Sequence, residues 1–267
     1  MGVEFEVGYN EIVKGLRKLG LTNGDKVLVH SSLSSFGKVE GGELTVIDAL
    51  LSVVGNKGIV AMPTHTWDTV NAKQPVFHAG LSRSIVGKIS ETFRNKTGVI
   101  RSRHPTHSVA AFGDNASRFV EGHENWSTPC SENSPYGKLV QEGGYVLLLG
   151  VDLSVCTLFH GFEEWAGCPW LFNRTEILYT VLNDGTIMKI PSRRHTDEKG
   201  YDRDYPAFEP LLLKSGIIRS VSLGNATVQL LDAKAASDLL VPLFKSHHDA
   251  PLSRRAEVST LSMKNLE

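Results

Sequence analysis

The sequence of 267 residues predicts one α/β domain. Apolar patterns with a helical repeat alternate with short apolar runs in its first half, which is typical of parallel βαβ units. The run YVLLLG at 145–150 is apolar throughout, as expected of a central strand that is covered on both faces. No linker rich in Pro, Gly or Ser divides the chain, so we expect a single domain.

The individual elements follow from the same patterns. Helices are expected at 12–19, 43–55, 82–95, 134–143, 207–216 and 233–247, and strands at 26–30, 58–64, 108–113, 145–150, 176–182, 186–190 and, as a pair, 217–232. The sequence NDG at 183–185 predicts a hairpin turn. We expect residues 1–246 to form the domain and residues 247–267 a loose polar C-terminal tail.

The charge balance favours a small-molecule partner. The chain has 28 Lys and Arg against 29 Asp and Glu, a net charge of -1, so nothing indicates nucleic acid or an anionic membrane. Three cysteines without a C-x-x-C pair argue against a disulfide framework and a zinc ribbon. The sequence has no signal-like segment, and we expect a soluble cytoplasmic protein. A homodimer stays open.

The segment VHSSLSSFG at 29–37 is a candidate anion site. An expected strand ends there in two serines, followed by a loop with glycine, which can direct N–H and hydroxyl groups at a pyrophosphate. An ordinary polar loop between a strand and a helix fits the pattern equally well. Walker A and G-x-G-x-x-G patterns are absent from the sequence.

Residues 101–113, RSRHPTHSVAAFG, bring two arginines, two histidines and a serine to the start of an expected strand. Arginine binds phosphate in a bidentate manner, so this is a second candidate for anion binding. An H-x-x-H pair without a nearby acidic or cysteine ligand is a weak zinc pattern. A metal-dependent hydrolase using His65, His104, His107 and His160 is the alternative from a different class.

The stretch LFHGFEEWAG at 158–167 places His160 on one helix face with Glu163 and Glu164. A carboxylate beside an imidazole fixes its tautomer and raises its basicity, as a general base requires. A helix with a solvated polar face has the same spacing. Cys156 raises a Cys–His nucleophile pair, but such pairs usually come from separate elements, so we interpret Cys156 as a core residue.

Six segments resemble, in order and spacing, the aminoglycoside 3-N-acetyltransferase family: VHSSLSSFG, MPTHTW, RSRHPTHSVAAFG, SPYGKL, YVLLLGVDLSVCTLFHGFEE and SVSLGNATVQLLDA. The resemblance covers about residues 9–244. It implies one three-layer α/β/α domain with a mixed central sheet, acetyl-CoA as the cosubstrate and no metal. It also implies acetyl transfer to N3 of a 2-deoxystreptamine aminoglycoside, giving antibiotic resistance.

The resemblance assigns roles to individual residues. The segment that resembles the CoA pantetheine and pyrophosphate site comprises His30, Ser31, Ser32, Leu33 and Ser34. Further implied CoA contacts are Thr64, Ser108, Val109 and, as a phosphate partner, Arg103. The catalytic positions are His160 as the base, Glu163 at its side and Asp202 as another carboxylate. Backbone N–H groups at 31–33 or at Thr64 are candidates for an oxyanion hole.

The acceptor is less constrained than the acetyl donor. A polycationic aminoglycoside requires an acidic pocket, for which the candidates are Asp68, Asp152, Glu163, Glu164 and Asp202. The sequence departs from the family pattern within HGFEE and at 65–80, where the acceptor should bind. Acetylation of a non-antibiotic amine is therefore the second alternative.

Overall fold

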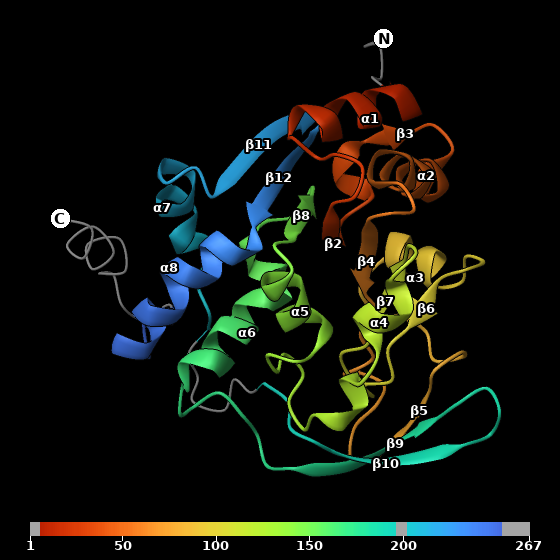
Figure 1. Cartoon of the computed structure of the whole chain (residues 1–267), viewed down its shortest axis with the longest axis vertical. Coiled ribbons are helices and arrows are strands. Elements are labelled where there is room, and N and C mark those ends of the chain that lie inside the picture. The colour runs from red at the N-terminus through yellow and green to blue at the C-terminus, as the bar shows by residue number, and fades with distance from the viewer. Residues whose placement is uncertain (1–5, 196–201, 253–267) are drawn as a thin grey trace.

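A seven-stranded mixed sheet forms the centre of the computed structural model, which describes residues 6–195 and 202–252 (Figure 1). Its strand order is β11-β12-β8-β2-β4-β7-β6. The central strands β2 (Lys26–Ser31), β4 (Ile59–Pro63) and β8 (Tyr145–Leu149) are parallel. The outer strands are β6 (Ile100–Arg101), β7 (Val109–Phe112), β11 (Ile218–Leu223) and β12 (Ala226–Asp232), and β7 and β12 run antiparallel to their central neighbours. The carboxyl ends of the parallel strands meet at one edge, where such sheets bind ligands.

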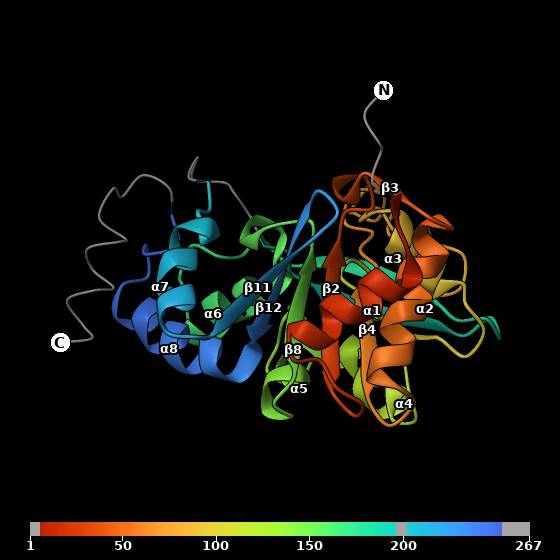
Figure 2. The same cartoon turned by 90° about the horizontal axis from the view of Figure 1, so that it is seen from above.

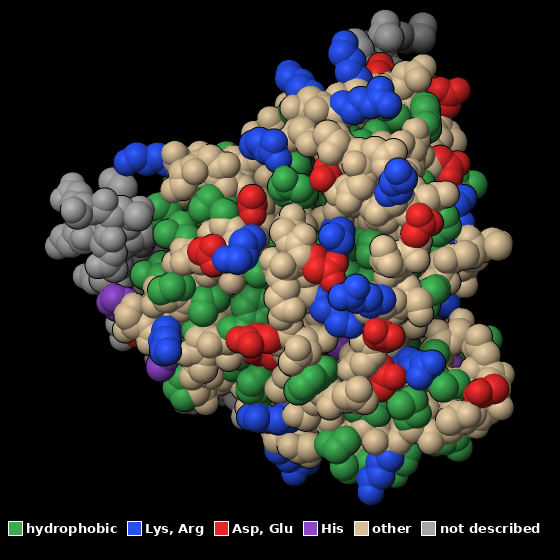
Figure 3. Space-filling model, in the orientation of Figure 1, with side chains coloured by type: hydrophobic (Ala, Val, Ile, Leu, Met, Phe, Trp, Pro, Cys, Tyr) green, Lys and Arg blue, Asp and Glu red, His purple; other side chains and the backbone are tan. Residues whose placement is uncertain are grey.

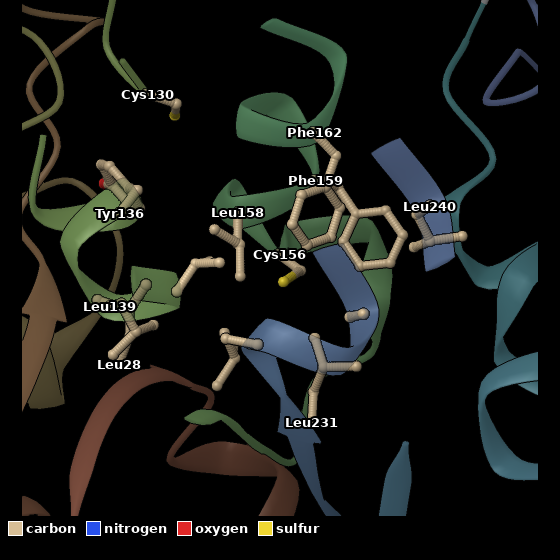
Figure 4. Close-up of a cluster of buried hydrophobic side chains, with 14 of the residues drawn as sticks. Leu28, Cys130, Tyr136, Leu139, Cys156, Leu158, Phe159, Phe162, Leu231 and Leu240 are labelled. Carbon is tan, nitrogen blue, oxygen red and sulfur yellow. The ribbon is translucent and has the colours of Figure 1, made fainter. Parts of the chain in front are cut away.

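Helices cover both faces of this sheet (Figures 1 and 2). One face carries α1 (Tyr9–Lys18), α2 (Gly42–Val54) and α3 (Lys88–Arg94), and the other carries α4 (Ala116–Val120), α5 (Pro135–Gln141), α6 (Thr157–Ala166), α7 (Glu209–Lys214) and α8 (Ala233–Ser246). In β8, Leu147 and Leu149 are buried toward α1 and α2, while Val146 and Leu148 join the cluster drawn in part in Figure 4. An apolar strand whose side chains alternate between faces needs both layers. The predicted three-layer fold is confirmed.

Two smaller sheets lie outside the central one. β1 (Glu6–Val7) pairs with β3 (Lys38–Val39), and β5 (Val76–His78), β9 (Glu176–Val181) and β10 (Ile187–Ser192) form a three-stranded sheet at the bottom of Figure 1. The hairpin predicted from NDG joins β9 to β10, and Gly185 there has a left-handed φ of 84° that glycine adopts without strain. Within the described residues, every helix falls short of the length and hydropathy that a membrane span requires.

Two boundaries differ from the prediction. The helix expected at 82–95 begins only at Lys88, because Gly87 has a φ of 107° that no helix accommodates. Residues 247–252 pack on the domain instead of starting a loose tail: Ala250 and Leu252 are buried, and Asp204 N donates to Pro251 O at 2.8 Å. Packing therefore continues past residue 246. The rest of the predicted tail, 253–267, lies outside the described residues.

Candidate active site

A cavity of about 740 Å³ opens where the three parallel strands end. This volume is typical of a pocket for a small organic ligand. Residues that follow the strands supply much of its lining: His30 and Ser31 from β2, Pro63 and His65 from β4 and just beyond it, and Cys156, Thr157 and His160 after β8. Further lining residues are Val29, Trp67, Val86, Ser90, His107, Val151, Ser154, Val155, Asn173, Arg194, His195 and Arg203.

His160 faces this cavity from the first turns of α6 and is held at its Nδ1. That atom lies 3.0 Å from Oε2 of Glu163 and 2.8 Å from the hydroxyl of Tyr205. We assign the Nδ1 proton to a hydrogen bond with the carboxylate, an arrangement that puts the ring lone pair on Nε2. The His160 side chain is 24% exposed, whereas that of Glu163 is fully buried. The pair predicted from the sequence is present, in the geometry of an oriented base.

Glu163 is held in turn by Arg203, whose Nε lies 3.1 Å from each carboxylate oxygen. Burial raises the pKa of Glu163, and the Arg203 guanidinium opposes that rise. Tyr205 also hydrogen-bonds to Glu163, and burial raises the pKa of the phenol well above its usual value, so this hydroxyl stays protonated. Arg203 and Tyr205 thus complete the support of His160.

The sequence patterns did not predict Arg203 and Tyr205 as site residues, and they predicted the adjacent Asp202 instead. Asp202 is exposed and absent from the described cavity lining, so its predicted place beside His160 is wrong. Arg203 makes an isolated bridge to Leu252, and Tyr205 begins a short 3-10 helix, so both are turned inward, whereas Asp202 is exposed. The sequence signal available was the need of a buried glutamate for a cationic partner.

A second His–Glu pair stands beside the first. Nε2 of His195 lies 2.7 Å from Oε1 of Glu164, and the rings of His195 and His160 stack with centroids 4.2 Å apart. Burial lowers the pKa of His195 to about 4, so its ring is neutral near pH 7. No sequence pattern marks His195 as a site residue, because it lies in a polar loop without periodicity.

The predicted CoA segment divides into two parts. His30 and Ser31 line the cavity. Ser32, Leu33 and Ser34 lie in the adjoining loop, where Ser32 Oγ accepts a hydrogen bond from Ser35 at 2.8 Å. Ser32 N donates to a carbonyl of β8 at 2.9 Å, so this N–H is already engaged and does not serve a predicted oxyanion hole in this arrangement.

Thr64, Ser108 and Val109 are fully buried beneath the cavity and are absent from its described lining. The hydroxyls of Thr64 and Ser108 lie 3.0 Å apart, and Nε of Arg101 contacts them at 3.1 and 3.0 Å. Thr64 N donates to Ser108 O, which also removes Thr64 from the oxyanion candidates. These residues brace the end of β4, and the structure gives no support to direct CoA contact by their side chains.

Arg103, the predicted phosphate partner, is absent from the described cavity lining. It is exposed, and its Nη1 lies 3.3 Å from Oε1 of Glu124 at the surface. Arg101 is the buried arginine of this segment, with its guanidinium 4.7 Å from the Phe77 ring centroid. The geometry therefore gives no support to phosphate binding by Arg103, and Arg101 is also absent from the described cavity lining.

The acidic acceptor pocket is not found among the described residues. Asp68 is exposed, the Asp152 carboxylate accepts from Ser154 N, and Glu164 is occupied by His195. The charged side chains in the described lining are instead Arg194 and Arg203. On the face shown in Figure 3, acidic and basic side chains are intermixed.

The histidines of the metal alternative are bonded to protein groups. His65 Nε2 lies 2.9 Å from the Tyr136 hydroxyl, and His107 Nδ1 lies 2.9 Å from Oγ1 of Thr106. Among the described residues, the group with ligand atoms close enough for a metal ion comprises Cys130, Glu164 and His195. It contains none of the four histidines proposed for a hydrolase.

Cys156 is buried at the start of α6, and its environment does not activate it. Burial raises the pKa of this thiol to about 12, so it is protonated near pH 7, whereas a nucleophilic cysteine needs its thiolate. The interpretation as a core residue agrees with this burial, although one side of Cys156 reaches the cavity lining.

Comparison with known proteins decides the family. A family model described as aminoglycoside 3-N-acetyltransferase matches residues 28–245. The chain belongs to the aminoglycoside 3-N-acetyltransferase family. Among relatives in this family, aminoglycoside N(3)-acetyltransferase IX of Micromonospora chalcea is 31% identical over 249 residues, which cover 84% of this chain and 88% of the relative. Aminoglycoside N(3)-acetyltransferase VII of Streptomyces paromomycinus is 37% identical over 175 residues, 59% of this chain and 60% of that protein.

Solved structures of the family have the same fold. The crystal structure of aminoglycoside acetyltransferase AAC(3)-Xa superimposes with a TM-score of 0.79 at 31% identity, covering 91% of this chain and 94% of that one. The binary complex of AAC-IIIb with CoASH gives a TM-score of 0.79 at 27% identity, over 94% of this chain and 100% of that one.

Proposed function

We propose that this protein transfers the acetyl group of acetyl-CoA to an amine, N3 of a 2-deoxystreptamine aminoglycoside in the leading hypothesis. Family membership and the likeness to AAC-IIIb, whose structure contains CoASH, support the donor. The observation that carries the proposal is His160, held at Nδ1 by buried Glu163 and lining the cavity.

The reaction requires an amine with its lone pair available. The amine nitrogen bonds to the thioester carbonyl carbon while His160 Nε2 takes a proton from it. The tetrahedral intermediate then collapses, the C–S bond breaks and the thiolate of CoA leaves with a proton returned from the imidazolium. Glu163 stabilises that imidazolium and keeps its ring oriented, as the acid of a catalytic triad does.

Direct transfer is favoured over a route through an acyl-cysteine. The Cys156 thiol lies in the cavity lining, but burial keeps it protonated, and Nδ1 of His160 contacts Glu163 and Tyr205. A ternary complex in which the amine attacks acetyl-CoA itself needs no activated thiol.

A second acceptor class is favoured by one observation. The charged side chains in the described cavity lining are Arg194 and Arg203, which pair with Glu176 and Glu163, so the described lining offers a polycation no carboxylate of its own. An amine that carries fewer positive charges, or an anionic group, fits this lining better. Acetylation of a non-antibiotic amine by the same mechanism is therefore the second candidate.

Release of free thiol from acetyl-CoA tests both candidates. The purified protein is mixed with acetyl-CoA and, separately, with kanamycin, gentamicin, apramycin, simple monoamines and amino acids. Rapid release with the aminoglycosides supports the leading hypothesis, and release only with the smaller amines supports the second. No release with any amine, together with no CoA binding at millimolar concentration in calorimetry, contradicts acetyl transfer.

A further inference from the structure

The ring of His160 is restrained by a stacked ring in addition to its hydrogen bond with Glu163. The imidazole of His195 stacks on it with centroids 4.2 Å apart and an interplanar angle of 18°. Phe172 stacks on His195 as well, with centroids 5.5 Å apart at 27°. A hydrogen bond at Nδ1 fixes one edge of an imidazole, whereas a stacked ring fixes its plane.

His195 is itself held firmly. Its Nε2 lies 2.7 Å from Oε1 of Glu164, and the same oxygen accepts from Cys130 N at 2.9 Å. The side chains of His195 and Glu164 are 5% and 6% exposed. A backbone bridge to Phe172 fixes the chain at this point. The adjacent glutamates of α6 therefore each hold one imidazole, and the two imidazoles contact each other.

The chemistry of this arrangement suits a base that becomes cationic. Burial lowers the pKa of His195 to about 4, so its ring stays neutral when His160 takes up a proton near pH 7. A neutral aromatic face beside an imidazolium is attractive, whereas a second imidazolium at this separation would be repulsive.

We propose that His195 is a positioning residue for acetyl transfer, which Glu164 and Phe172 hold against His160 so that the plane of the base is fixed toward the cavity. The inference rests on the proposed role of His160 as the base. It gives Glu164 a function that differs from the predicted contact with a cationic acceptor. Catalytic side chains must be held within a few tenths of an ångström, and a misplacement near 1 Å can cost about a hundredfold in rate.

Matched substitutions at one position separate stacking from hydrogen bonding. His195→Ala and His195→Phe both lose the bond to Glu164, but only His195→Ala loses the ring. Each is combined with Glu164→Gln, so that no buried carboxylate is left unpaired. We expect kcat to fall about tenfold to a hundredfold for the alanine variant and clearly less for the phenylalanine variant, with KM for acetyl-CoA and amine unchanged in both.

A double-mutant cycle then tests whether His195 acts through His160. His195→Ala should have little further effect on kcat in a His160→Ala background, because no base is left to position. Gly143→Ala, a strained turn variant at the opposite end of β8, controls for reduced stability without a change at the site. If His195→Ala does not fold, His195→Leu takes its place in both backgrounds, because leucine fills the site without an aromatic ring to stack on His160.

Three results would overturn the inference. These are equal kcat losses in the alanine and phenylalanine variants, a loss that follows the melting temperature as in Gly143→Ala, and a full additive effect in the His160→Ala background. Failure of the proposed function looks different: wild type then releases no thiol, or His160→Ala retains its rate.

Discussion

Glu163 and Glu164 are neighbours on α6 but differ in what they touch, and this difference identifies the base. Glu163 bonds to His160, which is 24% exposed, and is neutralised by Arg203. Glu164 bonds to His195, which is 5% exposed. A base must reach a substrate proton, so the more accessible imidazole of the two fits that role.

Replacing His160 by alanine should lower kcat by at least about a hundredfold, because the amine then loses its proton to solvent instead of to a positioned base. Stopped thiol-release assays with the best acceptor measure this loss. CoA binding in calorimetry should stay close to wild type. His78→Ala, at an exposed position of β5, is the matched control and should keep the wild-type rate. A near wild-type kcat for His160→Ala would assign the base to another group.

Some contacts of this site can be predicted from the sequence, and others cannot. The H-x-x-E spacing predicts the His160–Glu163 pair, because residues three apart on a helix are neighbours whatever surrounds them. Contacts between distant segments have no such rule. Arg203 and His195 reach the site from another part of the chain, so their approach depends on tertiary packing that no local pattern encodes.

At the scale of elements, the longer strands were predicted from the sequence, including the outer strands β7, β11 and β12, and the shortest strands were not. β2, β4 and β8 are buried on both faces, so their apolar runs mark them clearly. β1, β3 and β6 have two residues each, too few for any repeat to register. α3 begins later than its apolar pattern predicts because Gly87 has a φ of 107°, which lies outside the helical region.

Gly150 joins β8 to the segment that leads to α6, and alanine there should destabilise the protein by about 2–5 kcal/mol. Its φ is 67°, and a Cβ atom would lie 2.6 Å from Cβ of Ser35, which directly follows the predicted CoA segment. Urea denaturation measures the free energy of unfolding.

Gly143→Ala separates the two causes of this loss. Gly143 has nearly the same φ, 65°, but a Cβ atom there meets nothing within 4 Å. Gly143→Ala should lower the free energy of unfolding only by the cost of a left-handed backbone at alanine, about 1–2 kcal/mol. Gly150→Ala should also weaken CoA binding, because the clash displaces the loop beside Ser31 and Ser32. Equal destabilisation by the two variants would show that the close approach to Ser35 costs nothing.

At the scale of the whole molecule, the unusual feature is the number of buried histidines. Burial lowers the pKa of His30, His123 and His195 from 6.5 to about 4, and lowers those of His65, His104 and His107 well below 6.5. Neutral rings pack together without repulsion, as His104 and His123 do with centroids 4.7 Å apart. The fold therefore depends on these side chains remaining unprotonated.

This dependence predicts acid sensitivity between pH 6.5 and 4. The unfolded chain binds protons at these histidines near pH 6.5 while the folded chain does not, so stability is complete above pH 6.5 and falls as pH decreases. A depression from 6.5 to about 4 corresponds to about 3 kcal/mol for each of the three histidines with that value, against the 5–15 kcal/mol typical of a whole domain. Glu163, whose pKa is raised, acts in the opposite direction, but it is one group against six.

Urea unfolding measured from pH 8 to pH 5 should therefore show a free energy of unfolding that is flat above about pH 7 and then falls steeply, with proton uptake by several groups. His30→Leu is the matched variant, because it replaces a buried imidazole whose Nε2 has no partner among the described residues. It should change stability little at pH 7.5 and reduce the proton uptake on unfolding by about one below pH 6.5. A free energy of unfolding independent of pH down to pH 5 would mean that the buried histidines bind protons in the folded protein. The conclusion that His195 stays neutral beside His160 would then be wrong.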